Sequence, residues 1–495
     1  MTLTIPQLDW QPVVPLALLM MASVLVLVGS LFMEREEEST LVIVALAGVV
    51  AAAFSTIRLW GATTQSVFFG MLSIDHFGLA IALVVLLAAA GAILLAAQDE
   101  ALGAEYLALV LLATLGMVLL GEASNLMTVF LGIEILSLPL YVLAGLHGWR
   151  EGSREAAIKY VLLGAFSSGV LLYGMALTYG ATGSLTLATI ATDLSTHVGP
   201  LALVGLALLL VGIGFKLALV PFHSWTPDVY EGSPTPVTAF MSIGTKAAAL
   251  AALARVLLTG FPYVFQHWQP VLWGIAALTM LMGNLMALRQ TSVKRLMGYS
   301  GIAHAGYLAT AIVAGSALGI FASVYYLIAY VFMNLGIFAV VQGLSRGSEE
   351  GDSLASYRGL FYKRPVVAGA MVLFLMSLAS IPPTAGFLSK LTILLSVVQS
   401  GFWPLAAILV LSTLIGLYVY LKIILAMFER VPEEGVSTEE IREVAAAAEA
   451  GSGFPVRIPT TAWVVLGIAV VGTLGFGIVP GPVLHILGST SLLAP

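Results

Sequence analysis

The chain contains no cysteine among its 495 residues. It therefore provides no thiolate ligands for iron–sulfur clusters or Cys-rich zinc sites, and it forms no disulfide bond. Charged side chains are also scarce, at 9% of the residues against about 25% in an ordinary soluble domain. The few basic residues form no stripe of the kind that indicates nucleic-acid binding. The lack of cysteine excludes a cysteine-ligated redox centre in this chain. The scarcity of charge indicates that most of its surface does not face water.

Apolar residues make up 60% of the chain and recur in runs long enough to cross a bilayer. We therefore expect an all-α integral membrane protein with about 14 transmembrane helices. The first run exceeds the roughly 7–15 apolar residues of a signal peptide, so we expect it to be a retained span. The predicted helices cover residues 12–33, 41–60, 72–97, 104–121, 123–146, 156–181, 200–222, 234–258, 268–288, 293–314, 317–343, 365–400, 402–428 and 461–485.

Proline interrupts two of these runs, the seventh and the twelfth. Pro221 ends the apolar part of 200–222, and Pro382 and Pro383 divide a run that is too long for one straight span. A lysine lies near each interruption, Lys216 before the first and Lys390 after the second. We therefore predict that helices 7 and 12 are broken helices in equivalent positions of two repeats.

The two repeats would each contain five helices, and because five is odd, successive copies must be inverted. Inverted repeats with discontinuous helices usually place a transport site near the middle of the membrane. The predicted organisation is residues 1–103 for N-terminal helices 1–3, 104–258 for repeat 1 (helices 4–8), 259–428 for repeat 2 (helices 9–13), 429–460 for a polar cytoplasmic connector and 461–495 for helix 14.

Basic residues predict the orientation in the membrane. They gather in three connections, between helices 5 and 6, 9 and 10, and 11 and 12, which share one side of a fourteen-helix bundle. The positive-inside rule makes that side cytoplasmic, so both termini are expected on the periplasmic side. The residues are Arg150, Arg154 and Lys159; Arg289, Lys294 and Arg295; and Arg346, Arg358, Lys363 and Arg364.

Four lysines and one glutamate lie inside apolar runs. An ionisable group at the centre of a transmembrane helix costs about 2.5–3.5 kcal/mol, so several together indicate a function or mutual pairing. Glu134 is followed by Ser137 and Tyr141 on one helix face. It is a functional candidate, and the alternative is a structural carboxylate that joins two helices. The five residues are Glu134, Lys216, Lys246, Lys390 and Lys422.

The lysines differ in how well a structural role explains them. Lys246 lies 12 residues into its helix and shares a stripe with Thr238 and Ser242, so it is too deep for its ammonium to reach the interface. Lys216 and Lys390 lie beside the breaks, where each is either a functional group or a helix-break anchor. Lys422 is close to a polar helix end, so we expect its stem to extend to the interface.

Two histidines are further candidates. His223 follows Pro221 and either caps the broken helix or relays a proton. His304 shares a stripe with Ser300 and Tyr307, which favours a relay.

Burial disfavours the charged form of a lysine, and a nearby carboxylate favours it. Making and breaking one ion pair can therefore switch the proton affinity of the lysine. We hypothesise that Glu134 holds Lys216 charged, and that their separation sends a proton to Lys246 and then Lys390.

Two stretches carry a family resemblance. Residues 216–240 read KLALVPFHSWTPDVYEGSPTPVTAF, and residues 294–307 read KRLMGYSGIAHAGY. Both resemble the antiporter-like N subunits (subunit 2) of respiratory complex I, the proton-translocating NADH:quinone oxidoreductase of bacterial inner membranes. The resemblance implies that Glu134 and Lys216 form the ion pair of helices 5 and 7. It also implies that Lys246 is the central lysine and that Lys390 lies toward the periplasmic exit.

The resemblance further implies that this chain is a non-redox subunit of a translocase and binds no cofactor itself. NADH, FMN, iron–sulfur clusters and quinone are expected in other subunits of the complex. The expected partners are other membrane-arm subunits, especially neighbouring antiporter-like and small membrane subunits, together with lipid and no nucleic acid. Two alternatives stay open: a subunit of a multi-subunit sodium/proton antiporter or membrane-bound hydrogenase, and a structural scaffold, which leaves the interior charges unexplained.

Overall fold

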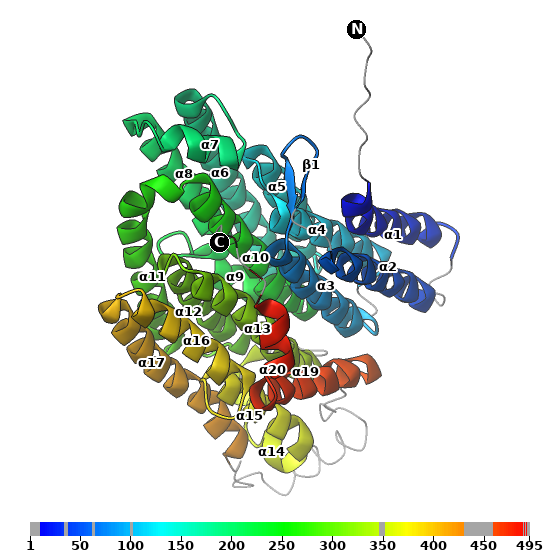
Figure 1. The fold of residues 1–495 in the computed structure, drawn as a ribbon. Helices are drawn as coiled ribbons and strands as arrows, with labels where there is room; N and C mark the ends of the chain where they lie inside the picture. Colours follow the sequence, from blue (N-terminus) through cyan, green and yellow to red (C-terminus); the bar gives the residue numbers. More distant parts are fainter. Residues whose placement is uncertain are drawn as a thin grey trace, which may run out of the picture.

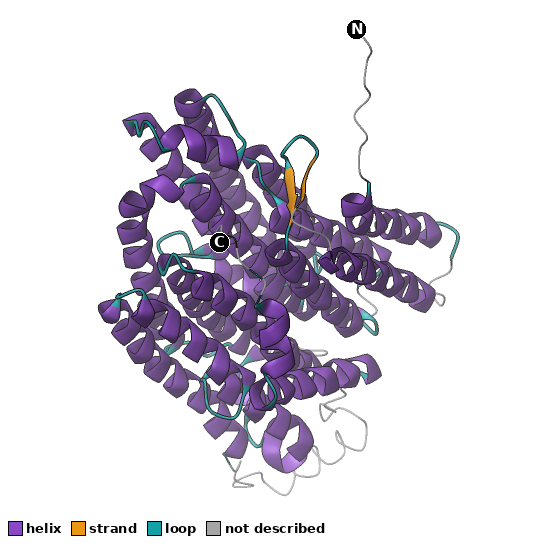
Figure 2. Ribbon diagram, in the orientation of Figure 1, coloured by secondary structure: helices purple, strands orange, loops and turns teal. Residues whose placement is uncertain are grey.

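The protein is a bundle of helices with a single small β-hairpin among the described residues (Figures 1 and 2). The computed structural model describes residues 10–33, 38–61, 65–99, 102–345, 352–429, 459–488, 490 and 492. The predicted connector 429–460 lies almost entirely outside these ranges. The elements are α1 Val14–Ser30, α2 Glu38–Arg58, β1 Gln65–Val67, β2 Leu72–Ile74, α3 His76–Ala96, α4 Ala104–Glu122, α5 Leu126–Ala144, α6 Glu151–Thr182, α7 Leu187–Leu194, α8 Pro200–Leu217, α9 Trp225–Gly232, α10 Thr235–Arg255, α11 Phe265–Ala287, α12 Val293–Val313, α13 Ala317–Ser345, α14 Leu360–Lys363, α15 Pro365–Leu378, α16 Ala385–Gln399, α17 Trp403–Phe428, α19 Thr460–Ile478 and α20 Gly481–Leu487.

Twelve helices within the described residues are long and apolar enough to cross a bilayer. They match twelve of the predicted spans. The tenth predicted span corresponds to α12, which has 21 residues, and the twelfth corresponds to the two shorter apolar helices α15 and α16. The all-α membrane fold is therefore confirmed, and the count of fourteen spans stays a prediction.

Two short segments lie between the long helices, and for one of them the sequence-based prediction was wrong. Residues 72–74, which were assigned to the third helix, form β2, paired antiparallel with β1 so that Gln65 lies opposite Ile74 and Val67 opposite Leu72. Residues 187–194 form the amphipathic helix α7, whose buried side includes Leu187, Ile190 and Leu194. Both segments are too short for hydropathy to separate them from loops.

Both predicted broken helices are confirmed. The first break separates α8 from α9 over residues 218–224, and the second separates α15 from α16 over residues 379–384. Each contains a non-glycine residue in the left-handed region, Ala218 with φ 61° and Ser380 with φ 64°, a conformation that is uncommon for such residues. This shared feature supports equivalent positions in two repeats, although the repeat boundaries stay a prediction. Each break also contains a cis proline, Pro221 and Pro383.

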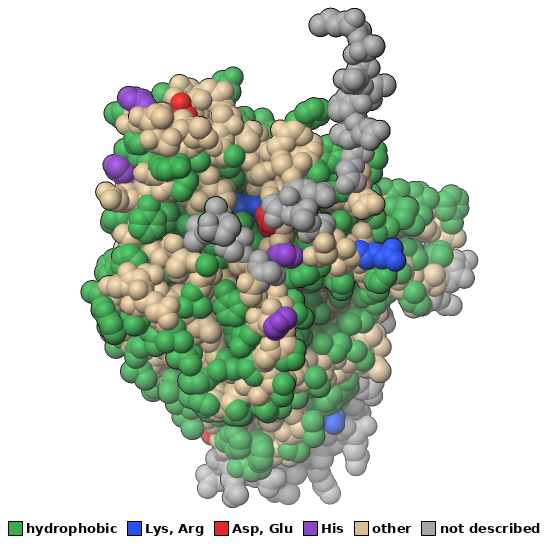
Figure 3. All heavy atoms as spheres, in the orientation of Figure 1, with side chains coloured by type: hydrophobic (Ala, Val, Ile, Leu, Met, Phe, Trp, Pro, Cys, Tyr) green, Lys and Arg blue, Asp and Glu red, His purple; other side chains and the backbone are tan. Residues whose placement is uncertain are grey.

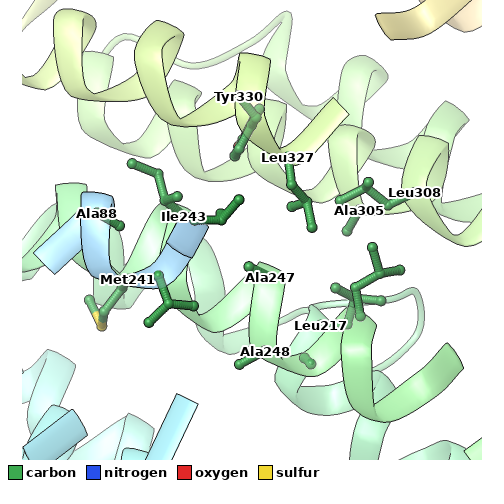
Figure 4. Close-up of a cluster of buried hydrophobic side chains, with 14 of the residues drawn as sticks. Ala88, Leu217, Met241, Ile243, Ala247, Ala248, Ala305, Leu308, Leu327 and Tyr330 are labelled. Atoms are coloured by element: carbon green, nitrogen blue, oxygen red, sulfur yellow. The ribbon is translucent and has the colours of Figure 1, made fainter. Parts of the chain in front are cut away.

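The centre of the bundle is formed by α10 and α13. Figure 1 shows them between α1 and α2 on one side and α11 and α17 on the other. Every residue of α10 is buried, and Figure 4 shows its apolar side chains Ile243, Ala247 and Ala248 among residues of neighbouring helices. In the outer helices α1, α2, α6 and α17, a third or less of the apolar membrane-spanning window is buried, as expected for lipid contact. The face drawn in Figure 3 is correspondingly apolar, with few charged side chains.

The basic connections do share one side of the bundle, as the sequence predicted. Arg295 of α12 pairs with Asp228 of α9 at 2.6 Å, and Lys159 of α6 contacts the same carboxylate at 2.6 Å. Lys294 contacts Asp352 at 3.3 Å, next to a backbone bridge between Ser292 and Ser353. A cavity of about 420 Å³ opens between these charged residues. We refer to this end of the molecule as the basic side.

A buried charge cluster joins three helix ends on the opposite side. Arg255, the last residue of α10, donates to Asp75 Oδ1 at 2.9 Å and to the backbone oxygen of Gly121 at 2.6 Å. Asp75 also caps α3 through the amide of Gly78, and the buried carboxyl of Glu122 lies beside the pair. A Cβ atom on Gly78 would lie 2.8 Å from Arg255 Nη2, so the cluster depends on close helix packing.

We expect Arg255→Leu to lower the free energy of unfolding by about 3 kcal/mol or more, because it leaves the Asp75 carboxylate buried without its cation. Thermal unfolding of the detergent-solubilised chain measures this change. Arg58→Leu is the matched control, because Arg58 lies at the end of α2 and is exposed. Equal losses of stability in the two variants would contradict a structural role for the cluster.

Candidate functional site

Lys216 lies in the last turn of α8, immediately before the first break. It is 2% exposed, and its Nζ donates to the hydroxyl of Tyr160 at 3.2 Å. Its ammonium lies 4.9 Å from the centre of the Tyr160 ring and 5.5 Å from that of Tyr141. Trp225 of α9 stacks on Tyr160 with ring centres 4.6 Å apart, which holds the tyrosine in place. The cation therefore exchanges water for aromatic faces and one hydroxyl.

Glu134 lies on α5 near Lys216, but the two side chains form no ion pair in this structure. The carboxylate instead accepts a hydrogen bond from Ser168 of α6, while Lys216 bonds to Tyr160. The direct pair that the family resemblance implied is therefore absent in the conformation observed. Glu134 is only half-buried, because it lies at the outer face of α5 and α6.

Lys246 lies near the middle of the fully buried helix α10 and is 2% exposed. Its Nζ donates to the Tyr230 hydroxyl at 2.9 Å and to the backbone oxygen of Ser242 at 3.3 Å. The rings of Tyr230 and Tyr330 lie 5.3 and 6.0 Å from the ammonium. Space for the ammonium comes from Gly301, where a Cβ atom would lie 2.9 Å from Nζ. The predicted stripe with Ser242 is confirmed.

His304 of α12 lies between Lys246 and Lys390. Its Nε2 is 2.9 Å from the hydroxyl of Tyr420, and its Nδ1 is hydrogen-bonded to the hydroxyl of Tyr326. Its ring centre lies 5.1 Å from that of Tyr330, the tyrosine beside Lys246. Ser300 contacts the same Tyr420 hydroxyl at 2.6 Å. Both ring nitrogens thus have hydroxyl partners, an arrangement that suits proton relay.

Lys390 lies in α16, just after the second break, and is 5% exposed. Its Nζ donates to the backbone oxygen of Leu378 at 3.3 Å, one of the carbonyls released where α15 ends. It lies 4.4 Å from the centre of the Tyr307 ring, and that ring is 5.4 Å from His304. The second break therefore supplies both a backbone acceptor and an aromatic partner.

Cation–ring and ring–ring contacts join these residues in a series from Lys246 through Tyr330, His304 and Tyr307 to Lys390, which we call the polar axis. The Lys216 group is attached to this axis by the short helix α9. One end of α9 places Trp225 against Tyr160, and the other places Tyr230 against Lys246. The break in helix 7 is thus what brings the two lysine groups together.

His223 is not part of the axis. It lies in the first break and is half-buried, and its Nδ1 has no hydrogen-bond partner among the described residues. Its role as cap or relay stays a prediction.

Lys422 extends to the end of the bundle, as predicted. Its Nζ donates to the backbone oxygens of Leu288 and Gln290, just after the end of α11.

Sequence reasoning missed most of the tyrosines that surround the cations. Tyrosine occurs often in membrane helices, and its hydroxyl gives no periodic polar signal when apolar residues surround it. Two of them were recognisable because they share a stripe with a charged residue, namely Tyr141 and Tyr307. The tyrosines that were missed are Tyr160, Tyr230, Tyr326, Tyr330 and Tyr420.

The arrangement provides groups that bind and pass protons. Lysine, histidine and tyrosine side chains all exchange protons, and here they lie in contact inside the bundle. Within the described residues, no group of three or more His, Asp or Glu side chains is placed to hold a metal ion. Proton transfer is a reaction that these titratable side chains can perform themselves.

A helical membrane bundle with two broken helices and buried lysines on a polar axis defines the class of antiporter-like membrane subunits. The chain belongs to the NADH:quinone oxidoreductase/Mrp antiporter family, and residues 123–416 are the part of the chain that matches this family. It is 43% identical over 461 residues to NADH-quinone oxidoreductase subunit N of Trichlorobacter lovleyi, covering 91% of this chain and 94% of the relative. It is 41% identical to the same subunit of Chloroflexus aggregans, covering 97% of each chain.

Solved structures agree with this assignment. A chain of respiratory complex I from Thermus thermophilus superposes with a TM-score of 0.80 at 36% identity, covering 96% of this chain and all of that one. A chain of the Mrp complex from Dietzia sp. gives the same TM-score at 24% identity, covering 96% of each chain. The second likeness shows that the fold is shared.

We expect Gly301→Ala to disturb the site without unfolding the bundle, because the new methyl group would lie 2.9 Å from Lys246 Nζ and would force the ammonium to shift. The activity of the assembled complex should fall while the amount of folded chain in the membrane stays constant. Gly274→Ala is the control, because no atom lies within 4 Å of a Cβ at that position. Unchanged activity in Gly301→Ala would show that the position of the ammonium is not critical.

Proposed function

We propose that this chain is the N-type membrane-arm subunit of a proton-translocating NADH:quinone oxidoreductase. Its named relatives cover nearly the whole chain at about 40% identity, and the complex I chain superposes over its full length. The observation that carries the proposal is the position of His304. Through tyrosine rings it joins the lysine in the middle of α10 to the lysine beside the second break.

The chain's own residues would move protons by changing the stability of the lysine cations. Each ammonium is removed from water, so its charge depends on neighbouring hydroxyls, aromatic rings and the nearest carboxylate. Strengthening the interaction between Glu134 and Lys216 would hold a proton on Lys216, and weakening it would release that proton toward Lys246. The hydroxyls of Tyr160 and Tyr230 are the first partners of the two ammonium groups.

The redox reaction would take place in other subunits, which would hold NADH, FMN, iron–sulfur clusters and quinone. The outer face of α5 and α6 supports contact with a neighbouring subunit, because Glu134 is half-buried there. A carboxylate near mid-bilayer that faces lipid costs several kcal/mol, so a polar group of a neighbouring antiporter-like or small membrane subunit would cover it.

We also propose that the basic side faces the bacterial cytoplasm and that both termini face the periplasm. The gathering of Arg150, Lys159, Lys294 and Arg295 at one end supports this orientation, because cytoplasmic loops carry an excess of basic residues. With this orientation, the Asp75 and Arg255 cluster lies at the periplasmic end.

Replacing Lys246 with methionine should abolish proton transfer through this subunit, because methionine keeps most of the side-chain volume but binds no proton. The number of protons pumped per NADH oxidised should fall in vesicles that contain the whole complex. Lys363→Met is the matched control, because Lys363 is exposed on α14.

Undiminished pumping by Lys246→Met would remove Lys246 from the path. Pumping that requires sodium and continues without electron transfer would instead favour the alternative of a sodium/proton antiporter subunit.

A further inference from the structure

Ser168 lies between the two residues that the proposed mechanism separates and reunites. Its hydroxyl donates to Glu134 Oε1. The same residue lines a small cavity with Lys216, and the other lining residues include Tyr141, Gly164 and Ser167. Glu134 itself does not line this cavity. Ser168 therefore provides a polar connection between the cavity at Lys216 and the Glu134 carboxylate.

The cavity has about the size that one water molecule requires. Its volume is about 10 Å³, and one water needs roughly 10–15 Å³ together with two or more polar partners. The ammonium of Lys216 offers protons beyond the one directed at Tyr160, and the Ser168 oxygen has lone pairs that accept. A water at this position would bridge the two groups.

Close helix packing on both sides keeps the cavity small. A Cβ atom at Gly164 would meet the Tyr141 hydroxyl at 2.0 Å, and one at Gly212 would meet Leu171 Cβ at 2.6 Å. The other serine of the cavity, Ser167, is buried and donates to the backbone oxygen of Gly212 at 3.4 Å. Ser167 thus binds α6 to α8, whereas Ser168 directs its proton at the carboxylate.

We propose that Ser168 is a proton-relay residue that connects Lys216 to Glu134 through one water molecule. This inference rests on the proposed function of the chain and adds a branch beside its path: Glu134 holds the proton while the pair is neutral, and the reverse transfer recharges Lys216 before it releases a proton toward Lys246. In the transfer, the Lys216 ammonium gives a proton to the water, and the water gives one of its own to the Ser168 oxygen. Ser168 passes its original hydroxyl proton to the carboxylate.

The transfer leaves a neutral lysine and a neutral carboxylic acid, with the water and the serine unchanged in composition. No electron is exchanged and no co-reactant is consumed. The relay therefore cancels two opposite charges without requiring the side chains to touch, which agrees with the absence of a direct ion pair in the structure.

The test compares Ser168→Ala with Ser167→Ala and Ser168→Thr in the whole complex reconstituted in vesicles. Ser168→Ala should lose most of the pumping attributable to this subunit, measured as protons per NADH oxidised. The amount of this chain in the purified complex should stay at its normal level, which reports intact assembly. Ser168→Thr keeps a hydroxyl and should restore pumping, and Ser167→Ala should pump normally.

Normal pumping by Ser168→Ala would overturn the relay, and so would an equal loss in Ser167→Ala, which would indicate packing of the cavity. Failure to restore pumping in Ser168→Thr, despite normal assembly, would also contradict it. Lys216→Met separates this inference from the proposed function. If Lys216→Met loses pumping and Ser168→Ala does not, only the relay fails, whereas normal pumping in Lys216→Met rejects the proton path itself.

Discussion

The structure depends on the stabilisation of ammonium groups inside the bundle without a carboxylate beside them. A lysine buried in a lipid-embedded bundle is costly unless acceptors and negative potential replace its water shell. Lys216, Lys246 and Lys390 meet this need in the same way, each with an aromatic ring centre within 5.3 Å and an oxygen acceptor within 3.3 Å. Among the described residues, no carboxylate oxygen lies within 4 Å of the three ammonium nitrogens. Because rings and hydroxyls stabilise a cation less than a carboxylate does, these lysines remain able to lose a proton.

The broken helices follow from the same constraint. An unbroken helix satisfies its own carbonyls, so it offers a buried lysine few acceptors. At the second break, the carbonyl of Leu378 becomes available to Lys390. At the first break, the chain turns into α9, which carries Trp225 and Tyr230 toward two different lysines. The charge clusters at the two ends of the bundle, around Asp228 and around Asp75, hold the surrounding helices in register.

The sequence predicted the features that depend on composition and spacing. Hydropathy located the spans, and proline located both breaks. The free-energy cost of an ionisable side chain inside a transmembrane helix identified Glu134 and the three buried lysines as candidates. Features that depend on which helices meet were not predictable, because a single sequence contains no distance information. Tyr420 lies 116 residues from His304 along the chain, and Tyr230 lies on a different helix from Lys246. Nothing in the local sequence of either tyrosine indicates these contacts. The Ser168 bond to Glu134 was missed for the same reason.

The most direct test of the account concerns His304, because the polar axis between Lys246 and Lys390 passes through its ring. The measurement is the number of protons pumped per NADH oxidised by the whole complex carrying His304→Phe. This substitution keeps an aromatic ring but removes both nitrogen atoms that contact tyrosine hydroxyls. The account predicts a lower number at an unchanged rate of NADH oxidation by an artificial acceptor. An unchanged number of protons would contradict transfer along this axis.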